Sequence, residues 1–160
     1  MQEVLIQTTK NLDKTDHDII RILQEDSSIA FVDIAEKIGV TDGTIHQRIR
    51  KLKKSGIIKR FTVELNTDLL GNNSLAYAMV AVEPGYLENI SKEIIENPHI
   101  QEIHEVHTQG QLLIKIRASS HEEVRNIIVD ELRKIKGIAN TELIPVYKIW
   151  KEEKNLIFPN

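Results

Sequence analysis

The sequence contains no cysteine in its 160 residues. A disulfide framework and a thiolate metal site are therefore excluded. No apolar stretch approaches the roughly 20 residues that a membrane-spanning helix needs, and the first residues lack the basic start and apolar core of a secretion signal. With 41% hydrophobic and 28% charged residues, the chain is expected to be a cytoplasmic globular protein of one or two domains without a membrane partner.

Acidic residues are missing from one stretch of the chain. The whole chain is acidic, with a formal charge of -3 and a pI near 6.1. Residues 43–60 nevertheless hold seven Lys or Arg and no Asp or Glu, whereas residues 1–42 hold four basic and nine acidic residues. Such a reversal of sign indicates an anionic partner for residues 43–60. A lysine-rich helix face that is merely solvated is the alternative, and composition by itself favours that alternative.

The first half of the chain has the apolar period of helices. A first helix is expected after Asp13, which is placed as N-cap, and Asp16 three residues later forms a variant of the capping box. A second helix is predicted within residues 30–39, and Gly39 ends it.

A third helix is predicted from about residue 42 to residue 54. Thr41 is its N-cap and Gly56 stops it, after which residues 57–66 are expected to be extended. Its apolar side is formed by Ile45, Ile49 and Leu52. Because this side is needed for the core, the basic residues of the helix must face outward.

The connection between the second and third helices is the short turn Gly39-Val40-Thr41. Ala35 lies four residues before Gly39, where two helices must cross closely, and Ile45 lies six residues after it. This is the spacing of a helix-turn-helix, whose second helix enters the DNA major groove. Any three-helix bundle can show part of this pattern. The basic stretch that coincides with it favours double-stranded DNA as the partner.

The outward side chains of the third helix have different expected roles on DNA. Thr44, His46 and Gln47 lie near the helix N-terminus and are predicted to read base edges, and Arg50 to reach guanine. The expected phosphate contacts are Arg48, Lys51, Lys53, Lys54, Lys59 and Arg60. The predicted DNA-binding residues of the helix and its cap are therefore Thr41, Thr44, His46, Gln47, Arg48, Arg50, Lys51, Lys53 and Lys54.

The second half of the chain changes to the period of strands. The predicted elements are strand 74–83, helix 85–98, strands 100–108 and 112–118, helix 120–137 and strand 138–150. This βαββαβ order predicts a ferredoxin-like fold, so the chain as a whole is α+β. A turn-rich connector near residues 66–74 separates the halves. The expected domains are residues 1–65, with helix-turn-helix and extended linker, and residues 66–160.

One face of the predicted sheet has no helix to cover it. Met79 or Val80, Leu113, and alternate residues of the stretch 143–150 should lie there. A bare apolar sheet face in water is a dimer interface or a ligand platform. We expect a homodimer in which two sheets pack face to face.

The histidines do not form a metal site in the predicted strands. His104 and His107 are three residues apart and should point to opposite faces, and Glu102 shares a face with His104 only. No nucleophile–base pair and no phosphate-binding glycine loop occurs. The sequence therefore predicts no enzyme, no metal and no cofactor.

The stretches "LDKTDHDIIRILQED" and "IAEKIGVTDGTIHQRIRKLKKSGIIKRF", with the βαββαβ remainder, resemble the leucine-responsive regulatory protein/AsnC family of feast/famine transcription regulators. The likeness covers about residues 12–150, and Arg48, Leu52, Gly56 and Ile58 match the family pattern. The resemblance implies a prokaryotic regulator with a winged-type DNA-binding domain and an amino-acid-sensing domain. It also implies homodimers that assemble further, to tetramers or octamers, with the effector held between dimers.

Two positions depart from the family pattern. The family commonly opens its second helix with Ser, where this chain has Ala30 and lacks the cap. The family's effector loop often reads Thr-Gly-x-x-Asp, and Gln111 stands where the acid would receive an α-amino group. The residues expected to contact the effector are His107, Thr108, Gln109, Gly110 and Gln111. An ordinary tight turn is the alternative for this loop.

The sequence thus predicts a sequence-specific DNA-binding transcription regulator, modulated by an amino acid or related metabolite and located with the nucleoid in the cytoplasm. One alternative is a small-molecule-binding module without specific DNA binding. A second is an enzyme built on the ferredoxin-like half, against which the lack of an acid/base or nucleophile cluster argues.

Overall fold

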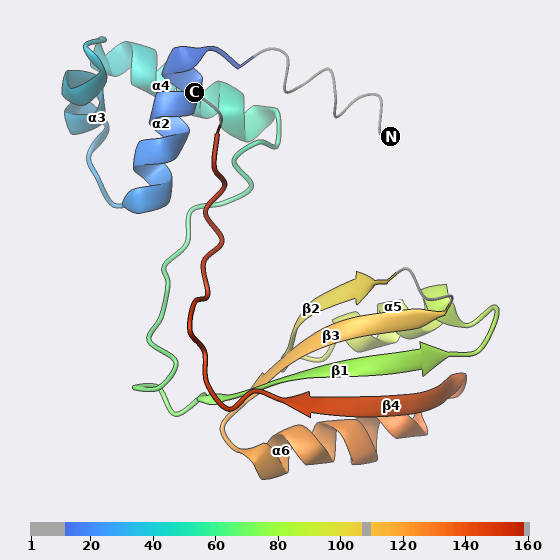
Figure 1. The fold of residues 1–160 in the computed structure, drawn as a ribbon. Coiled ribbons are helices and arrows are strands. Elements are labelled where there is room, and N and C mark those ends of the chain that lie inside the picture. The colour runs from blue at the N-terminus through green and yellow to red at the C-terminus, as the bar shows by residue number, and fades with distance from the viewer. Residues whose placement is uncertain (1–11, 107–109, 159–160) are drawn as a thin grey trace. The chain divides into compact units, whose positions relative to one another are not determined.

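The computed structural model describes residues 12–106 and 110–158 of the chain (Figure 1). These residues form two compact units. The first unit comprises residues 12–64 together with 153–158, and the second comprises residues 65–152. The sequence-based division at 65/66 differs from this one chiefly in the C-terminal segment, whose described residues 153–158 pack with the first unit.

The first unit is a bundle of three helices. They are α2 (Lys14–Glu25), α3 (Phe31–Ile38) and α4 (Asp42–Lys54). The predicted caps of α2 and α4 are confirmed, because Asp13 and Asp16 form a reciprocal capping box and Thr41 accepts a hydrogen bond from the backbone of Thr44. Ala30 makes no side-chain cap at α3. The buried core consists of Ile19, Ile20, Leu23, Ile34, Ala35, Ile45, Ile49 and Leu52.

The turn between α3 and α4 depends on one glycine. Gly39 has φ +79°, a left-handed conformation that residues with a Cβ rarely adopt. The backbone N–H groups of Gly39 and Val40 both donate to the Ala35 carbonyl, at 2.9 and 3.0 Å. Ala35 itself is 4% exposed. The predicted helix-turn-helix is therefore present, with a small residue where the helices cross.

The second unit is a four-stranded antiparallel sheet with helices on one face (Figure 1). Its elements are β1 (Ser74–Val82), α5 (Leu87–Ile95), β2 (Ile100–Glu105), β3 (Gln111–Ala118), α6 (His121–Asn126) and β4 (Ile138–Pro145). The strand order β2-β3-β1-β4 is that of the ferredoxin-like fold predicted from the βαββαβ pattern, so the predicted α+β class is confirmed.

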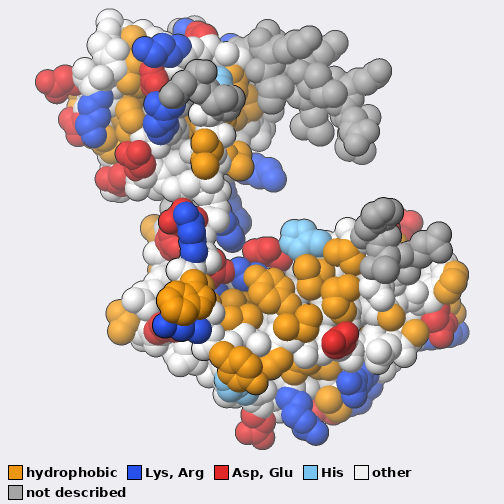
Figure 2. Space-filling model, in the orientation of Figure 1, with side chains coloured by type: hydrophobic (Ala, Val, Ile, Leu, Met, Phe, Trp, Pro, Cys, Tyr) orange, Lys and Arg blue, Asp and Glu red, His pale blue; other side chains and the backbone are white. Residues whose placement is uncertain are grey.

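The two faces of the sheet differ in what covers them. Alternate strand residues pack with α5 and α6 in a core that includes Ala78, Val80, Ile90, Ile114, Ile116 and Ile128. The apolar residues of the other face are Leu75, Tyr77, Met79, Ala81, Leu113 and Ile144. Met79 and not Val80 thus lies on the open face. Figure 2 shows hydrophobic side chains gathered over this sheet.

Several elements of the second unit are shorter than predicted, and α5, for example, spans Leu87–Ile95 where residues 85–98 were expected. The helix expected over residues 120–137 is α-helical only to Asn126 and continues as a π-helical turn, Ile127–Glu131, and a 3₁₀ turn, Leu132–Lys134. The strand expected to reach residue 150 ends at Pro145, opposite Ala76 of β1, and the next backbone N–H, that of Val146, donates to the Leu75 carbonyl at 3.0 Å. No helix in the described ranges is long and apolar enough to cross a membrane.

Candidate nucleic-acid interface and ligand-binding region

The predicted DNA-binding residues of α4 are not equally accessible. Thr44 and Arg48 are half-buried. The exposed members are Thr41, His46, Gln47, Arg50, Lys51, Lys53 and Lys54. Because Ile45, Ile49 and Leu52 occupy the opposite side of the helix, the exposed members form one outward surface.

Four of these side chains share the centre of the outward surface of α4. Gln47, Arg50, Lys51 and Lys54 follow one another at i, i+3, i+4 and i+7, the spacing of neighbours on one helix face. We call these four residues the reading face. Within the described residues, no carboxylate lies within ion-pair distance of the three basic members. The reading face therefore presents its positive charge to solvent.

The N-terminus of α4 is ordered by its own hydroxyl and imidazole groups. Thr41 Oγ1 accepts from the Thr44 backbone N–H at 3.3 Å and lies 2.8 Å from Thr44 Oγ1. The His46 ring packs edge-on against Phe31, with 4.9 Å between ring centroids, and its Nε2 lies 3.7 Å from an Asp42 oxygen. His46 thus lies at the edge of the reading face, toward α3.

Arg48 points to a different place from the reading face. Its Nη1 donates to Asp13 Oδ2 and lies 3.1 Å from Oδ1 of Asp16, a residue with 0% exposed side chain. Asp16 Oδ1 has no aligned hydrogen-bond donor among the described residues, so its contact with Arg48 is an ion pair. Arg48 therefore joins α4 to the N-terminus of α2, which sequence reasoning missed.

Lys53 also has an intramolecular neighbour. Its Nζ lies 5.5 Å from the centroid of the Phe61 ring, within the range of a cation–π interaction. Phe61 belongs to the extended segment that follows α4. In this segment, residues 59–66 form no strand with any other described residue.

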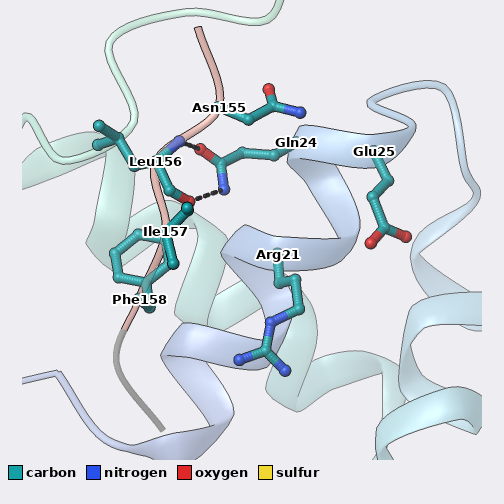
Figure 3. A pocket seen from close by; sticks show the side chains of 7 residues that line it. All are labelled: Arg21, Gln24, Glu25, Asn155, Leu156, Ile157 and Phe158. Carbon is teal, nitrogen blue, oxygen red and sulfur yellow. Dashed lines mark hydrogen bonds between the residues drawn. The ribbon is translucent and has the colours of Figure 1, made fainter. Parts of the chain in front are cut away.

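The C-terminal segment is an unpredicted part of the first unit. Gln24 of α2 pairs with the backbone of Leu156, accepting from its N–H at 2.7 Å and donating to its carbonyl at 3.1 Å. Figure 3 shows this pair in a groove lined by Arg21, Gln24, Glu25, Asn155, Leu156, Ile157 and Phe158. The Phe158 ring packs edge-on against His17 at 5.1 Å. No periodic signal in the sequence marks these contacts.

The predicted effector loop is described only in part. His107, Thr108 and Gln109 lie outside the described residues. Gly110 has φ +69°, and its carbonyl accepts from the Val82 N–H at 2.6 Å. Gln111 begins β3 beside Ala81 of β1. Contact between these residues and an effector stays a prediction.

A charged cluster lies on the open face of the sheet. Lys115 and Arg117 of β3 have 5% and 7% exposed side chains, and both contact the Glu152 carboxylate, Arg117 at 2.8 Å. Arg117 also donates to Thr67 Oγ1 at 3.1 Å, and Lys115 lies 3.5 Å from Glu102. The alternation of charged and apolar residues in "LLIKIRA" was the available signal for this cluster.

The pKa values of this cluster favour its charged form. Burial lowers the pKa of Lys115, but the hydrogen bond to Glu152 and the charges of Glu152 and Glu102 outweigh it, so the net pKa is raised. The hydrogen bond from Lys115 holds the pKa of Glu152 below its ordinary value, against the effect of burial. Glu152 is therefore bound to the sheet as a carboxylate.

The histidine of β2 makes a local pair. His104 Nε2 lies 3.1 Å from Glu102 Oε2, as expected for two residues on one strand face. Across residues 12–106 and 110–158, no group of three or more His, Asp or Glu side chains is placed to hold a metal ion.

Comparisons with known proteins agree with both units. A winged helix-turn-helix DNA-binding model matches residues 12–59, and an Lrp/AsnC ligand binding domain model matches residues 75–156. The chain is 34% identical over 145 residues to the HTH-type transcriptional regulator FL11 of Pyrococcus furiosus, covering 91% of this chain and 95% of that protein.

Solved structures show the same fold. A transcriptional regulator from Neisseria meningitidis in complex with L-Met superposes with a TM-score of 0.86 at 19% identity, covering 92% of this chain and 97% of that one. AsnC of E. coli superposes with a TM-score of 0.84 at 19% identity, covering 90% and 97%.

The fold, the basic α4 and these matches define a transcription regulator with a helix-turn-helix DNA-binding domain and a ligand-binding domain. The chain belongs to the Lrp/AsnC family. The predicted family and the predicted regulatory function are confirmed, in preference to a ligand-binding module without DNA binding. The family is one of transcription regulators and not of enzymes.

Proposed function

We propose that this regulator recognises a specific DNA site through the reading face of α4. Gln47 and Arg50 lie at base edges, where Gln can bond adenine in two places and Arg can bond guanine. Lys51 and Lys54 lie at phosphates, which set register and affinity. The observation that carries the proposal is the exposure of these four side chains on one side of the second helix of a helix-turn-helix.

Footprinting on the protein's own genomic DNA tests this proposal. Gln47→Ala and Arg50→Ala should change the preferred sequence, whereas Lys54→Gln should weaken binding to all sequences alike. Lys92→Gln is the matched control, because Lys92 is an exposed lysine of α5 in the second unit, paired with Glu88 at 2.8 Å. Equal, weak binding of the wild type to all DNA would show that the proposal is wrong.

We propose that the protein acts as a homodimer, assembled further to tetramers or octamers, in which the open sheet faces of two chains pack together. The apolar residues of that face support this, since Ile144 is 43% exposed in a single chain. A dimer would present two α4 helices to successive major grooves of a near-palindromic site on nucleoid DNA in the cytoplasm.

Light scattering coupled to gel filtration tests the assembly. Ile144→Lys should give a lighter species, because a charge would be buried between the sheets. Ile95→Lys is the control, since Ile95 is 62% exposed on helix α5, which covers the other face. Equal masses for both variants would exclude the open face as the interface.

We propose that an amino acid or related metabolite binds the second unit at the β2–β3 loop and changes the affinity for DNA. The ligand-binding domain match supports a small-molecule ligand, and the Neisseria regulator was solved with L-Met. Such control requires the ligand to bind two states with different affinity. No cofactor is part of the proposal.

The effector is tested by thermal unfolding and footprinting, each repeated with every common amino acid. The effector should raise Tm and change site occupancy, and Gln111→Ala should reduce both effects. If no amino acid moves either measurement, the effector proposal fails while the DNA-binding proposal stands.

A further inference from the structure

The guanidinium of Arg48 faces the bundle and not the outward surface of α4. Its side chain is 29% exposed, and its Nη1 contacts one oxygen of Asp13 and one of Asp16. Both carboxylates belong to the N-terminal end of α2. Arg48 is thus a contact between two helices, and it is not part of the reading face.

The four carboxylate oxygens at this helix end are divided between backbone N–H groups and Arg48. Asp13 Oδ1 accepts from the Asp16 backbone N–H at 3.0 Å, and Asp16 Oδ2 accepts from the Asp13 backbone N–H at 3.4 Å. These two contacts are the capping box. The remaining oxygens, Asp13 Oδ2 and Asp16 Oδ1, both face Arg48. Arg48 therefore completes the set of contacts that begins α2.

The charges explain why a cation is needed at this place. Asp16 is 0% exposed, and a buried carboxylate without a partner is strongly destabilising. The helix N-terminus supplies only a partial positive charge. The hydrogen bond from Arg48, with that from the Asp16 N–H, lowers the pKa of Asp13, and the contacts with Asp13 and Asp16 raise the pKa of Arg48. Asp13 and Arg48 are thus both favoured in their charged forms.

We propose that Arg48 is a positioning residue for DNA recognition, which holds α4 against the N-terminus of α2 through Asp13 and Asp16 and contacts no phosphate. This differs from the phosphate role expected for Arg48 from the sequence, and it rests on the proposed DNA contacts of α4. Through this contact, the N-terminus of α2 sets the angle at which the reading face meets the groove.

Salt-dependent DNA binding separates a positioning residue from a phosphate contact. Arg48→Gln should lower affinity at every salt concentration without changing the slope of log K against log salt. Lys54→Gln should reduce the magnitude of that slope by about 0.9, the value for one phosphate contact on duplex DNA. An equal loss of slope in Arg48→Gln would overturn the proposal.

The DNA affinity of Asp13→Asn is a second test, in which the acid and not the arginine is changed. Asparagine caps helices as well as aspartate does, so the substitution removes the charge that Arg48 binds and keeps the cap. If Arg48 contacted phosphate, loss of this acid would free the guanidinium and raise DNA affinity. A rise together with a salt slope steeper by about 0.9, the value of one added phosphate contact, therefore overturns the proposal, whereas a change in affinity without that change of slope supports it.

The double variant Asp16→Asn/Arg48→Gln covers the case in which Arg48→Gln does not fold. It removes the buried charge together with its partner, so it should fold and bind DNA with the wild-type salt slope. A slope reduced by one phosphate contact would overturn the proposal.

Urea unfolding of Arg48→Gln, Asp16→Asn and the double variant measures the coupling of Arg48 and Asp16 without DNA. If the wild type shows no specific site, the proposed function fails. The unfolding cycle still decides whether Arg48 holds α4 on α2, and additive effects of the two single substitutions would overturn that.

Discussion

Gly110, in the predicted effector loop, is a glycine whose replacement should be costly because backbone atoms lie close to it. Its φ of +69° is unfavourable for any residue with a Cβ. A Cβ at this position would also lie 2.7 Å from the Val82 carbonyl oxygen. That oxygen belongs to the backbone of β1 and cannot rotate away, and the Val82 N–H donates to Gly110 at 2.6 Å.

The expected magnitude for Gly110→Ala has two parts. The left-handed conformation costs an L-residue about 1–2 kcal/mol, and forcing extra atoms into a packed place costs a further ~1–3 kcal/mol. Gly71→Ala is a matched control, because Gly71 has φ +74° and an added Cβ there meets no atom within 4 Å. The control should therefore lose about 1–2 kcal/mol, and Gly110→Ala clearly more.

Urea unfolding of both variants measures the difference in the free energy of unfolding. Hydrogen exchange of peptides from β1 and β3 shows whether the loss is local to the second unit. Gly110→Ala should increase exchange at the end of β1 and should also weaken the response to any amino-acid effector. If both variants lose the same stability, the close approach of Gly110 to Val82 is refuted.

Three other changes test separate contacts. Thr41→Ala should lower the stability of the first unit by about 1 kcal/mol through loss of the α4 N-cap, measured by urea unfolding, and Thr41→Ser should restore it. The pKa of Glu152 is lowered below 4.5 in the folded chain, so its ion pairs stabilise the second unit above pH 4.5, and this stability is lost as the pH falls through the folded pKa. Glu152→Gln should therefore flatten the acid limb of stability against pH, and parallel curves would contradict this. Phe158→Ala should destabilise the first unit by less than the roughly 3–5 kcal/mol of a fully buried Phe, whereas Ile157→Ala, at a side chain 95% exposed, should leave unfolding unchanged.

The helix-turn-helix was predictable because residues close in sequence determine where its helices begin and end. Thr41 as cap and Gly39 as left-handed turn act over three or four positions, so the pattern places α4 at residues 42–54, where the structure has it. Local hydrogen bonds need no knowledge of the remaining chain. Helix ends with such caps are therefore the most reliable part of the prediction.

The strand ends and the last helix were less predictable because distant residues decide them. Residues 146–150 keep an apolar pattern, yet β4 ends at Pro145, although β1 extends two residues beyond the Ala76–Pro145 pair. The switch of the last helix to π-helical geometry at Ile127 has no sequence signal that we can identify. Side chains alternate between the two faces of a strand, so the sequence alone left open whether Met79 or Val80 lies on the open face. The pairing of Met79 with Leu113 shows that it is Met79.

The sequence could predict which side of α4 faces outward, but not the individual contacts of its side chains. Helical period placed Gln47 and Arg50 outward, because buried isoleucines hold the other side of α4. It could not show that Arg48 meets Asp13, since the two residues are 35 positions apart in the sequence. The pairing of Gln24 with Leu156, across 132 positions, was hidden for the same reason.

The contact of Arg48 with the two acids also bears on how an acidic chain can bind DNA. Asp13 and Asp16 lie next to α4, and unpaired they would repel the phosphates that its lysines attract. One guanidinium compensates much of their charge, and the buried position of Asp16 keeps that compensation from being screened by salt. If Arg48 is a positioning residue as proposed, α4 has one phosphate contact fewer, and the acids nearest to it are largely neutralised. The cations that we propose for DNA on the reading face are then Arg50, Lys51 and Lys54, beside Gln47 on the same side of the helix.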